Sequence, residues 1–396
     1  MNGEKVYLAH YGRSAFSRSR PKEPEKDVFN SLRMDEVLAG LINDSIDKTG
    51  VKPSEVNDVI TGCALQVLEN WTYGGRHPVL LSKLPDSVPG MSLDRACSSS
   101  LNAITIGAME ISTGNADIVL AGGMEHMTHV PLNDNEHVKA NVRLLVRPEY
   151  LKHEMNIGYS MGLTAEKLAS LKGIKREEMD RYSAESHQRA AKAQEDGYFK
   201  GEIVPVQAEF QGKEITIDKD QSIRPETTLE KLAALPPAFK QGGVITAGNS
   251  SPLNAGASLV MLMSEKKVKE YGIKPLSSIT SFGWAAVPPS IMGQGVVPAS
   301  QKALDKAGMK PEDIDIYEFN EAFAAVPLNA MKELGIDREK VNMNGGAIAI
   351  GHPLGASGAR LAGTLSRLLN SKGKDRGLAS LCVGGGQGYT AIFERV

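Results

Sequence analysis

One arrangement of helix, turn and strand occurs twice in this chain, 258 positions apart, and this repeat limits the possible folds more than any other feature. Residues 50–59 (GVKPSEVNDV) resemble residues 308–317 (GMKPEDIDIY). In both copies a helix-like segment ends at the glycine, and a proline follows three positions later, which is ordinary helix termination. Each copy then continues into a short apolar segment typical of a strand, at 58–61 and at 315–318.

The two copies also agree further along the chain. Apolar residues at helical spacing follow Cys97 in one copy and His352 in the other. Each run leads to an apolar strand that ends in glycines, 118–121 and 378–381. We therefore expect an α/β protein built from a duplicated βαβ-rich unit. A coincidence between two unrelated αβ connections is the alternative, and it would have to extend over all of these elements.

The stretch between the two halves differs from them in composition. It contains polar and basic segments and one long amphipathic helix candidate at 177–194. We expect an inserted loop domain, because loops over a rigid α/β scaffold commonly carry ligand specificity. The predicted division is an N-terminal half at 1–126 with part of 251–270, the insertion at 127–250, and a C-terminal half at 271–396.

Composition excludes several classes of function. The formal net charge is −2 over 396 residues, so no global field favours nucleic acid. No apolar run approaches the roughly 18–20 residues of a membrane span. Three cysteines form neither a disulfide framework nor a CxxC metal motif, and no carboxylate or cysteine spacing around His126 and His129 indicates a metal site. These observations predict a cytoplasmic protein with no metal.

Two reactive side chains lie at the predicted helix starts of the repeat. Cys97 stands in the first turn, where unpaired N–H groups and the helix dipole favour a thiolate. A buried, inert cysteine is the alternative, and position alone does not decide between them. His352 precedes Pro353, a residue favoured at the first helical position. A helix N-terminus disfavours a protonated imidazole, so His352 would be neutral and could act as a base. The alternative is a histidine with a structural role in a turn.

Two further segments place polar groups at strand ends. Cys382 leads into the glycines 384–386, where bare backbone N–H groups can bind an anion. The glycines superficially resemble a dinucleotide loop, but no helix pattern follows them. Asn320 and Glu321 close another apolar strand, a usual location for a site in α/β proteins, although a simple polar loop start is possible. The third cysteine, Cys63, reads as a buried small residue.

Eight segments, in this order, resemble those of the thiolase family, and the match runs nearly from end to end. They are 97–99 (CSS), 121–127 (AGGMEHM), 161–166 (MGLTAE), 223–228 (IRPETT), 246–251 (TAGNSS), 320–323 (NEAF), 351–353 (GHP) and 382–388 (CVGGGQG). The resemblance implies a five-layered αβαβα fold from two duplicated halves with an inserted loop domain. It also implies thiolysis of 3-oxoacyl-CoA by CoA, or the reverse Claisen condensation.

The resemblance also implies roles for single residues. Cys97, activated by His352, would attack the 3-oxo carbonyl and carry the acyl group as a thioester. Cys382 would protonate the departing carbanion. His352 and a water held by Asn320 would stabilise the enolate oxygen. Backbone N–H groups of Cys97 and Gly384 would hold the oxyanion of the tetrahedral intermediates.

For the substrate, the resemblance implies coenzyme A and acyl-CoA with no permanently bound cofactor. Arg224 would meet the adenine end and Ser251 the pantetheine, while Met161 and Phe323 would line the acyl pocket. The family resemblance further implies a homo-oligomer, dimeric or tetrameric, and allows a complex with other β-oxidation enzymes.

Within the family, the degradative 3-ketoacyl-CoA type fits best. Residues 123–131 and 290–293 resemble that type, and Ser160 stands where short-chain biosynthetic thiolases commonly have histidine. A biosynthetic acetoacetyl-CoA thiolase is the alternative. A β-ketoacyl synthase-type condensing enzyme would need histidine in place of Asn320. A silent thiolase-like scaffold is disfavoured, because all three reactive side chains are intact.

Overall fold

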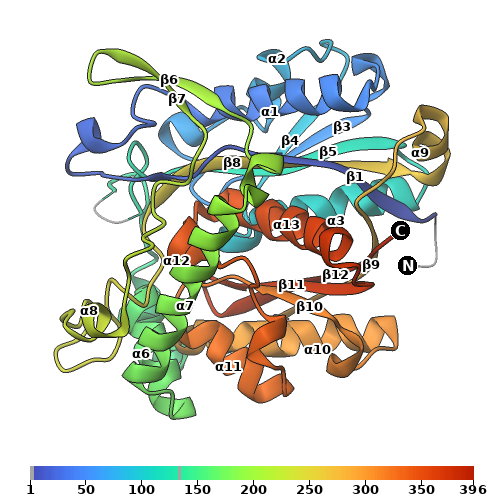
Figure 1. Cartoon of the computed structure of the whole chain (residues 1–396). Coiled ribbons are helices and arrows are strands. Elements are labelled where there is room, and N and C mark those ends of the chain that lie inside the picture. The colour runs from blue at the N-terminus through green and yellow to red at the C-terminus, as the bar shows by residue number, and fades with distance from the viewer. Residues whose placement is uncertain (1–3, 133–134) are drawn as a thin grey trace.

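Five layers of helices and strands stack on one another in the computed structural model, which describes residues 4–132 and 135–396 (Figure 1). Helix α1 (Met34–Thr49) covers one outer face, and helices α10 (Val296–Ala307) and α11 (Ala325–Leu334) cover the other. Helices α3 (Ser99–Ser112) and α13 (Ser357–Lys372) form the central layer, between two layers of strands. This αβαβα arrangement confirms the predicted fold class.

The first layer of strands contains the N-terminal copy of the repeat. Strand β3 (Asp58–Gly62) is parallel to β5 (Ile118–His126), and β5 is antiparallel to β8 (Asn254–Ser264). Strand β8 in turn is antiparallel to β1 (Val6–Arg13), and β4 (Gly90–Leu93) is parallel to β3 at the edge.

The second layer repeats these pairings in the same order and directions. Strand β10 (Ile316–Phe319) is parallel to β11 (Arg376–Val383), and β11 is antiparallel to β12 (Gln387–Glu394). Strand β12 is antiparallel to β9 (Ser277–Ala286), the counterpart of β1. The duplicated unit is therefore present in the structure. A short antiparallel pairing between β1 and β9 joins the two layers into one continuous sheet around the central helices.

Glycines explain where the outer helices end and how closely the central ones approach. Gly50 and Gly308 cap α1 and α10 with φ of 66° and 65°, a left-handed conformation that glycine adopts without cost. At Gly358 in α13, a Cβ atom would lie 2.4 Å from the backbone nitrogen of Leu101 in α3. Any side chain there would separate the central helices, and Cys97 and His352 lie in the segments just before the N-terminal ends of these helices.

The apolar core has three parts that follow the layers. One contains α1 and the facing side of the first sheet half, with Leu38, Ile42 and Leu259. The second fills the space around α3 and α13, and the third lies between the second sheet half and α10 and α11. Strands β5, β8 and β11 are buried on both faces, which explains why they read as continuous apolar runs rather than alternating ones.

The segment between β5 and β8 folds into helices and one hairpin. The helix predicted at 177–194 is α7 (Arg176–Glu195). The other elements of this segment are α4 (Arg143–Val146), α5 (Met155–Gly158), α6 (Met161–Lys172), β6 (Val206–Phe210), β7 (Lys213–Ile217) and α8 (Leu229–Ala233). Elsewhere lie β2 (Ser17–Arg18), α2 (Arg76–Leu80), α9 (Glu265–Tyr271) and α12 (Ala347–Ile350). Across residues 4–132 and 135–396, no helix has the length and apolar character needed to cross a membrane.

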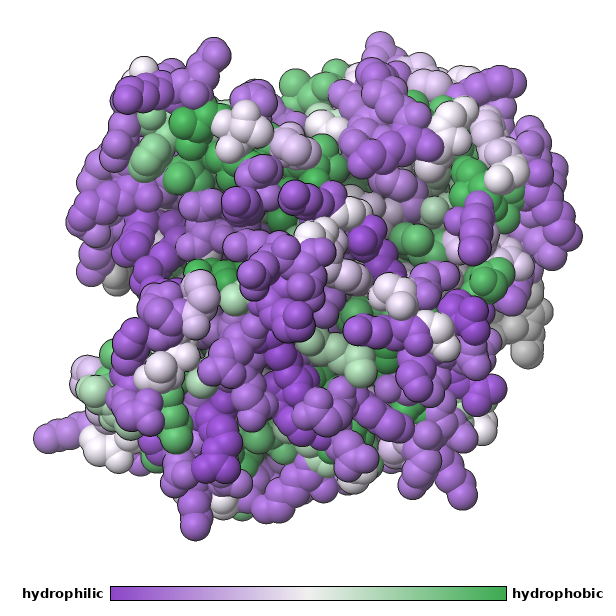
Figure 2. All heavy atoms as spheres, in the orientation of Figure 1, coloured by the Kyte–Doolittle hydropathy of each residue, from purple (hydrophilic) through white to green (hydrophobic). Residues whose placement is uncertain are grey.

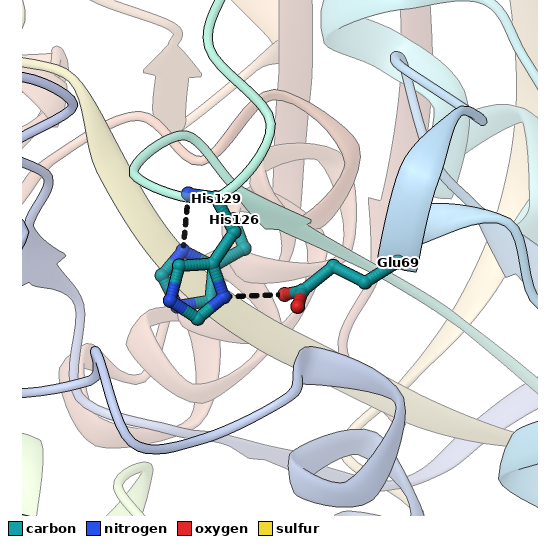
Figure 3. Close-up of side chains that lie close together, drawn as sticks. All are labelled: Glu69, His126 and His129. Carbon is teal, nitrogen blue, oxygen red and sulfur yellow. Dashed lines mark hydrogen bonds and ion pairs between the residues drawn. The ribbon is translucent and has the colours of Figure 1, made fainter.

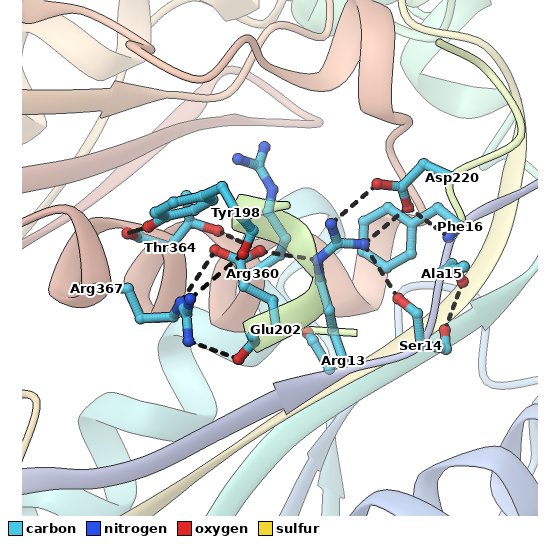
Figure 4. A network of polar contacts seen from close by, with 12 residues as sticks. Arg13, Ser14, Ala15, Phe16, Tyr198, Glu202, Asp220, Arg360, Thr364 and Arg367 are labelled. Atoms are coloured by element: carbon cyan, nitrogen blue, oxygen red, sulfur yellow. Dashed lines mark hydrogen bonds and ion pairs between the residues drawn. The ribbon is translucent and has the colours of Figure 1, made fainter. Parts of the chain in front are cut away.

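A buried cluster of charges ties this segment to β1 (Figure 4). The guanidinium of Arg13, at the end of β1, donates two hydrogen bonds to Asp220, at 2.7 and 2.9 Å, and one to Glu202 at 3.1 Å. Glu202 follows α7 and Asp220 follows the β6–β7 hairpin, so one cation holds two points of the inserted segment. All three side chains are buried.

We expect Arg13→Met to destabilise the protein by about 3–5 kcal/mol, because it removes the cation from buried Asp220 and leaves buried Glu202 with the longer contact to Arg367 at 3.7 Å. The measurement is the free energy of unfolding from chemical denaturation. Arg181→Ala is the matched control, since Arg181 forms only an exposed pair with Glu177, and its loss should change stability by less than about 0.5 kcal/mol. A loss below about 1 kcal/mol for Arg13→Met would contradict the assigned role.

Candidate active site

The reactive segments of the two halves meet at the N-terminal ends of the central helices. The 3₁₀ turn Ala96–Ser98 contacts both the turn Leu354–Ala356 and the end of β11. The predicted helix starts were wrong in detail, because α3 begins at Ser99 and α13 only at Ser357. Pro353 precedes the 3₁₀ turn instead of occupying the first helical position.

The backbone before Cys97 is bent by a residue in a left-handed conformation. Ala96 has φ of 44°, an uncommon value for a residue with a side chain and one that occurs preferentially at functional sites. Hydrogen bonds hold the bend: Asp94 accepts from the N–H of Ala96, and Ser99 accepts from the N–H of Arg95 at 2.9 Å. This bend directs Cys97 away from its own helix, towards the end of β11.

Cys97 is a neutral thiol at rest. Its side chain is buried, and burial raises the pKa of the thiol to about 12. The backbone N–H groups of Gly384 and of Cys97 itself act on the sulfur in the opposite direction and lower that pKa. The expectation that the helix start produces a thiolate was therefore wrong, since desolvation outweighs the N–H groups. A base must remove the proton before the sulfur can attack.

The hydrogen bonds of His352 define its tautomer. Ser357 Oγ donates to the carbonyl of Pro353 at 2.8 Å, so it can only accept from His352 Nδ1, 2.5 Å away. Nδ1 therefore carries the proton, and the lone pair is on Nε2. The backbone is held as well, because the N–H of His352 donates to Asn254 at 2.8 Å. Gly351, with φ of 120°, permits this close approach, since a Cβ atom would lie 2.6 Å from the Asn254 amide.

His352 is also uncharged over the whole physiological range. Burial, and then the positive charge of Arg360, lower the pKa of the imidazole to about 3. The expected neutral base is consistent with this environment, although desolvation rather than the helix end is the main cause.

Asn320 lies directly after β10 and faces the histidine. Its Nδ2 is 3.1 Å from His352 Nε2 and donates to the lone pair there. Its Oδ1 is buried and accepts no hydrogen bond from residues 4–132 or 135–396. The neighbouring Glu321 has a structural role, because it accepts from Tyr182, Ser186 and Asn342 at 2.7–2.9 Å.

The other two cysteines occupy different environments. Cys382 ends β11, is fully buried and interacts electrostatically with Cys97. Burial, and then the charge that Cys97 would carry as a thiolate, raise the pKa of Cys382 well above its usual value. Cys63 is also buried, and its thiol donates to Glu125 at 3.5 Å, in agreement with the sequence-based interpretation as a buried small residue.

A pocket of about 490 Å³ lies between β2, α8 and the loop before β8. In Figure 2 the outline of the molecule is indented on the left, between the lobe that carries α8 and the upper half. Arg224 and Ser251, which the resemblance assigns to CoA, both line this pocket. Met161 and Phe323 do not line it. Met161 packs on the core under α10 and α11. Phe323 contacts two residues of the pocket wall, Phe239, with ring centroids 5.9 Å apart, and Ser250, through a β-bridge.

Several residues of this region were not identified as pocket residues from the sequence. Arg18, Arg20, His187 and Phe239 line the same pocket. No motif marks them, because they come from three separate parts of the chain. Ser357 was also missed, although a hydroxyl five positions after His352 lies within reach of the ring when a turn intervenes.

Two stacked histidines and a carboxylate form a further cluster (Figure 3). Glu69, from the 3₁₀ turn Leu68–Asn70, lies 2.7 Å from His129 Nδ1, a carboxylate that the sequence spacing around His126 and His129 does not indicate. The imidazole rings are 3.8 Å apart with planes 11° from parallel. Since a metal ion lies in the plane of each ligating ring, such stacking does not suit a shared metal. Glu69 raises the pKa of His129 above its usual value, which favours an imidazolium–carboxylate pair.

Comparisons with known proteins agree with this geometry. Residues 15–266 match the family model for the thiolase N-terminal domain, and residues 273–395 match that for the C-terminal domain. A 3-ketoacyl-CoA thiolase of Vibrio vulnificus is 44% identical over 374 residues, which cover 93% of this chain and 95% of that protein. A 3-ketoacyl-CoA thiolase of Marinobacter nauticus is 42% identical over 375 residues, with 93% and 94% coverage.

Solved structures of similar proteins superpose over nearly the whole chain. An acetyl-CoA acetyltransferase of Bacillus anthracis has a TM-score of 0.89 at 37% identity and covers 100% of this chain and 99% of its own. A human mitochondrial 3-ketoacyl-CoA thiolase has a TM-score of 0.88 at 34% identity, with 99% of each chain covered. Two matching family models, close sequence relatives and full-length structural similarity lead to one conclusion: the chain belongs to the thiolase family.

Proposed function

We propose that this protein is an acyltransferase that cleaves 3-oxoacyl-CoA with CoA, producing acetyl-CoA and a shortened acyl-CoA through an acyl-Cys97 intermediate. The observation that carries the proposal is that the turn of Cys97 contacts both the turn just after His352 and the strand that contains Cys382, while the N–H of Gly384 acts on the Cys97 sulfur. The names of the sequence relatives support the degradative reaction over acetoacetyl-CoA synthesis.

In the first step Cys97 attacks the 3-oxo carbonyl while its proton passes to His352 Nε2, which gives up its hydrogen bond from Asn320 Nδ2 as the proton arrives. The N–H groups of Cys97 and Gly384 hold the oxyanion, a role in which one donor contributes about 2.7–4 kcal/mol. The bond between C2 and C3 then breaks. Its electron pair forms the enolate of acetyl-CoA, which takes a proton from Cys382, while the acyl group stays on Cys97.

In the second step CoA releases the acyl group. The thiol of CoA attacks the thioester, and its proton restores Cys382. Cys97 leaves as a thiolate and recovers its proton from His352, so both thiols end as they began. Asn320 contributes by positioning His352 Nε2, and its free Oδ1 can accept from a water that donates to the enolate oxygen.

The same proposal includes the domain division, the oligomeric state and the CoA-binding residues. The two halves are 1–126 with part of 251–270, and 271–396, and the insertion 127–250 supplies the CoA pocket, together with the segment around β2 and the loop before β8. We expect a cytoplasmic homo-oligomer, dimeric or tetrameric, that is able to work beside other β-oxidation enzymes, with CoA and acyl-CoA as its only cofactor-like ligands. Arg224 and Ser251 would contact CoA, and Met161 and Phe323 would border the acyl chain.

The test is a CoA-dependent cleavage assay with acetoacetyl-CoA and with 3-oxoacyl-CoAs of increasing chain length, followed by loss of the enolate absorbance. We expect turnover of the longer substrates at rates at least equal to that of acetoacetyl-CoA. Turnover of acetoacetyl-CoA alone would support the biosynthetic alternative, and turnover of none would reject the enzymatic function.

A further inference from the structure

Three arginine side chains line the pocket between β2 and α8 without a carboxylate to neutralise them. Arg18 is in β2, Arg20 follows it, and Arg224 comes from the loop between β7 and α8. The pocket has no acidic residue among its described lining residues. Within residues 4–132 and 135–396, no carboxylate oxygen lies within the 4.0 Å of an ion pair with any of the three guanidinium groups.

The fully buried arginines of this protein, Arg13 and Arg360, show the contrast. Arg13 has two carboxylate partners, and Arg360 pairs with Glu318 at 3.1 Å. A buried cation is normally paired in this way because desolvation is costly. Arg18 and Arg20 are half-buried and Arg224 is exposed, and none of the three has a carboxylate partner among the described residues, so the positive charge of this pocket stays available to a ligand.

The cost of this arrangement is visible at two of the three side chains. Arg20 Nε is buried and has no hydrogen-bond partner among the described residues, which leaves a donor unsatisfied. Arg18 is half-buried, and burial together with the positive charges of Arg224 and Arg20 lowers its pKa below the usual value. Like charges held together at a pocket wall are expected where an anionic ligand completes the site.

His187 supports the same assignment from the pocket wall. Its Nδ1 accepts from the backbone N–H of Arg224 at 3.2 Å, so its Nε2 carries the proton. Burial, and then the charge of Arg224, lower its pKa to about 4, so it adds a neutral donor rather than a fourth charge.

The pocket also has an apolar part, with Leu232, Leu235 and Phe239. An anionic ligand that fits both parts carries several negative charges at one end and an apolar or amide-containing arm at the other. An acyl-CoA has this chemistry, with a pyrophosphate and a 3′-phosphate on the nucleotide and a pantetheine arm.

We propose that Arg18 and Arg20, together with Arg224, bind the phosphate groups of the CoA nucleotide and thereby select CoA thioesters over thioesters of short thiols. The inference rests on the proposed function and extends it to two arginines of the N-terminal segment. Guanidinium groups suit this task because their planar donors match phosphate oxygens in pairs.

The test measures the dissociation constants of CoA, dephospho-CoA and pantetheine by calorimetry on the full-length protein. We expect Arg18→Gln and Arg20→Gln each to weaken CoA binding about 10-fold or more and to leave pantetheine binding within about twofold. Dephospho-CoA separates the two phosphate groups: a smaller loss with it than with CoA assigns that arginine to the 3′-phosphate, and an equal loss assigns it to the pyrophosphate. Arg181→Ala, which removes an exposed charge elsewhere, should change none of the three constants.

The integrity of the variants is checked by acetyl transfer to Cys97 from acetyl-N-acetylcysteamine, which carries no phosphate and should react at the wild-type rate. Unchanged CoA binding in both variants would overturn the inference, and so would an equal loss for CoA and pantetheine. If the wild type cleaves 3-oxoacyl-CoA while the variants bind CoA normally, only this inference fails. If the wild type cleaves none, the proposed function fails first.

Discussion

Replacing Cys97 with alanine is expected to reduce thiolysis of 3-oxoacyl-CoA by about 10⁴–10⁶-fold, the range seen when an enzymatic nucleophile is removed. The reason is that the acyl group has no other carrier: Cys382 is fully buried, and Cys63 is engaged with Glu125. The measurement is the turnover number in the cleavage assay, together with mass spectrometry of protein incubated with acetyl-CoA. Wild type should carry one acetyl group, on Cys97.

Two companion variants separate the roles of the three cysteines. Cys382→Ala should still form the acetyl-Cys97 adduct slowly from acetyl-CoA, because acylation of Cys97 does not require the second thiol. It should fail in thiolysis, where a proton must reach the carbanion. Cys63→Ala should keep turnover within about threefold of wild type. An acetyl group found on Cys63, or retained activity in Cys97→Ala, would overturn the assignment.

The features that sequence predicts well are those produced by local chemistry. The glycines at 50 and 308 end their helices, as expected, because their left-handed conformation is intrinsic to the residue type. Helix α7 keeps its amphipathic spacing within one residue of the predicted range at each end. The prediction of a duplicated unit was correct for the same reason, since each copy contains the same short-range helix, turn and strand signals.

The predicted protonation states were partly wrong, because they depend on burial in the folded protein rather than on local sequence. The sequence places Cys97 near a helix start, and that favours a thiolate. In the structure the thiol is covered by segments from the other half of the chain, including the end of β11, and the desolvation of the sulfur dominates. Burial of this kind depends on residues about 250–285 positions away, so no local pattern reports it.

Clusters assembled from distant segments were missed for the same physical reason. Glu69 reaches His129 across 60 positions, and Arg18 approaches Arg224 across more than 200. Neither partner of such a pair has an unusual neighbour in sequence. The expectation that Met161 and Phe323 border the acyl chain stays a prediction, since neither residue lines the pocket between β2 and α8.

Removal of the base is the second change with a large expected effect. His352→Ala should lower the turnover number at pH 7 by about 10²–10⁴-fold, the usual contribution of a positioned acid–base group. Ser357→Ala should give a smaller loss, about 10–100-fold, because it frees the imidazole to rotate or to change tautomer without removing it. His137→Ala, at an exposed position, should leave turnover unchanged.

The pH dependence distinguishes a base from a structural histidine. Because the pKa of His352 is lowered to about 3, Nε2 stays unprotonated from pH 5 to 8, and wild-type kcat/KM should show no acid limb near pH 6.5. In His352→Ala, the reaction depends on the fraction of Cys97 present as thiolate. Because the pKa of Cys97 is about 12, this fraction rises about tenfold per pH unit between pH 7 and 9. The gap between variant and wild type should therefore close with rising pH. A gap that stays constant over this range would show that His352 holds the site together rather than taking the proton from Cys97.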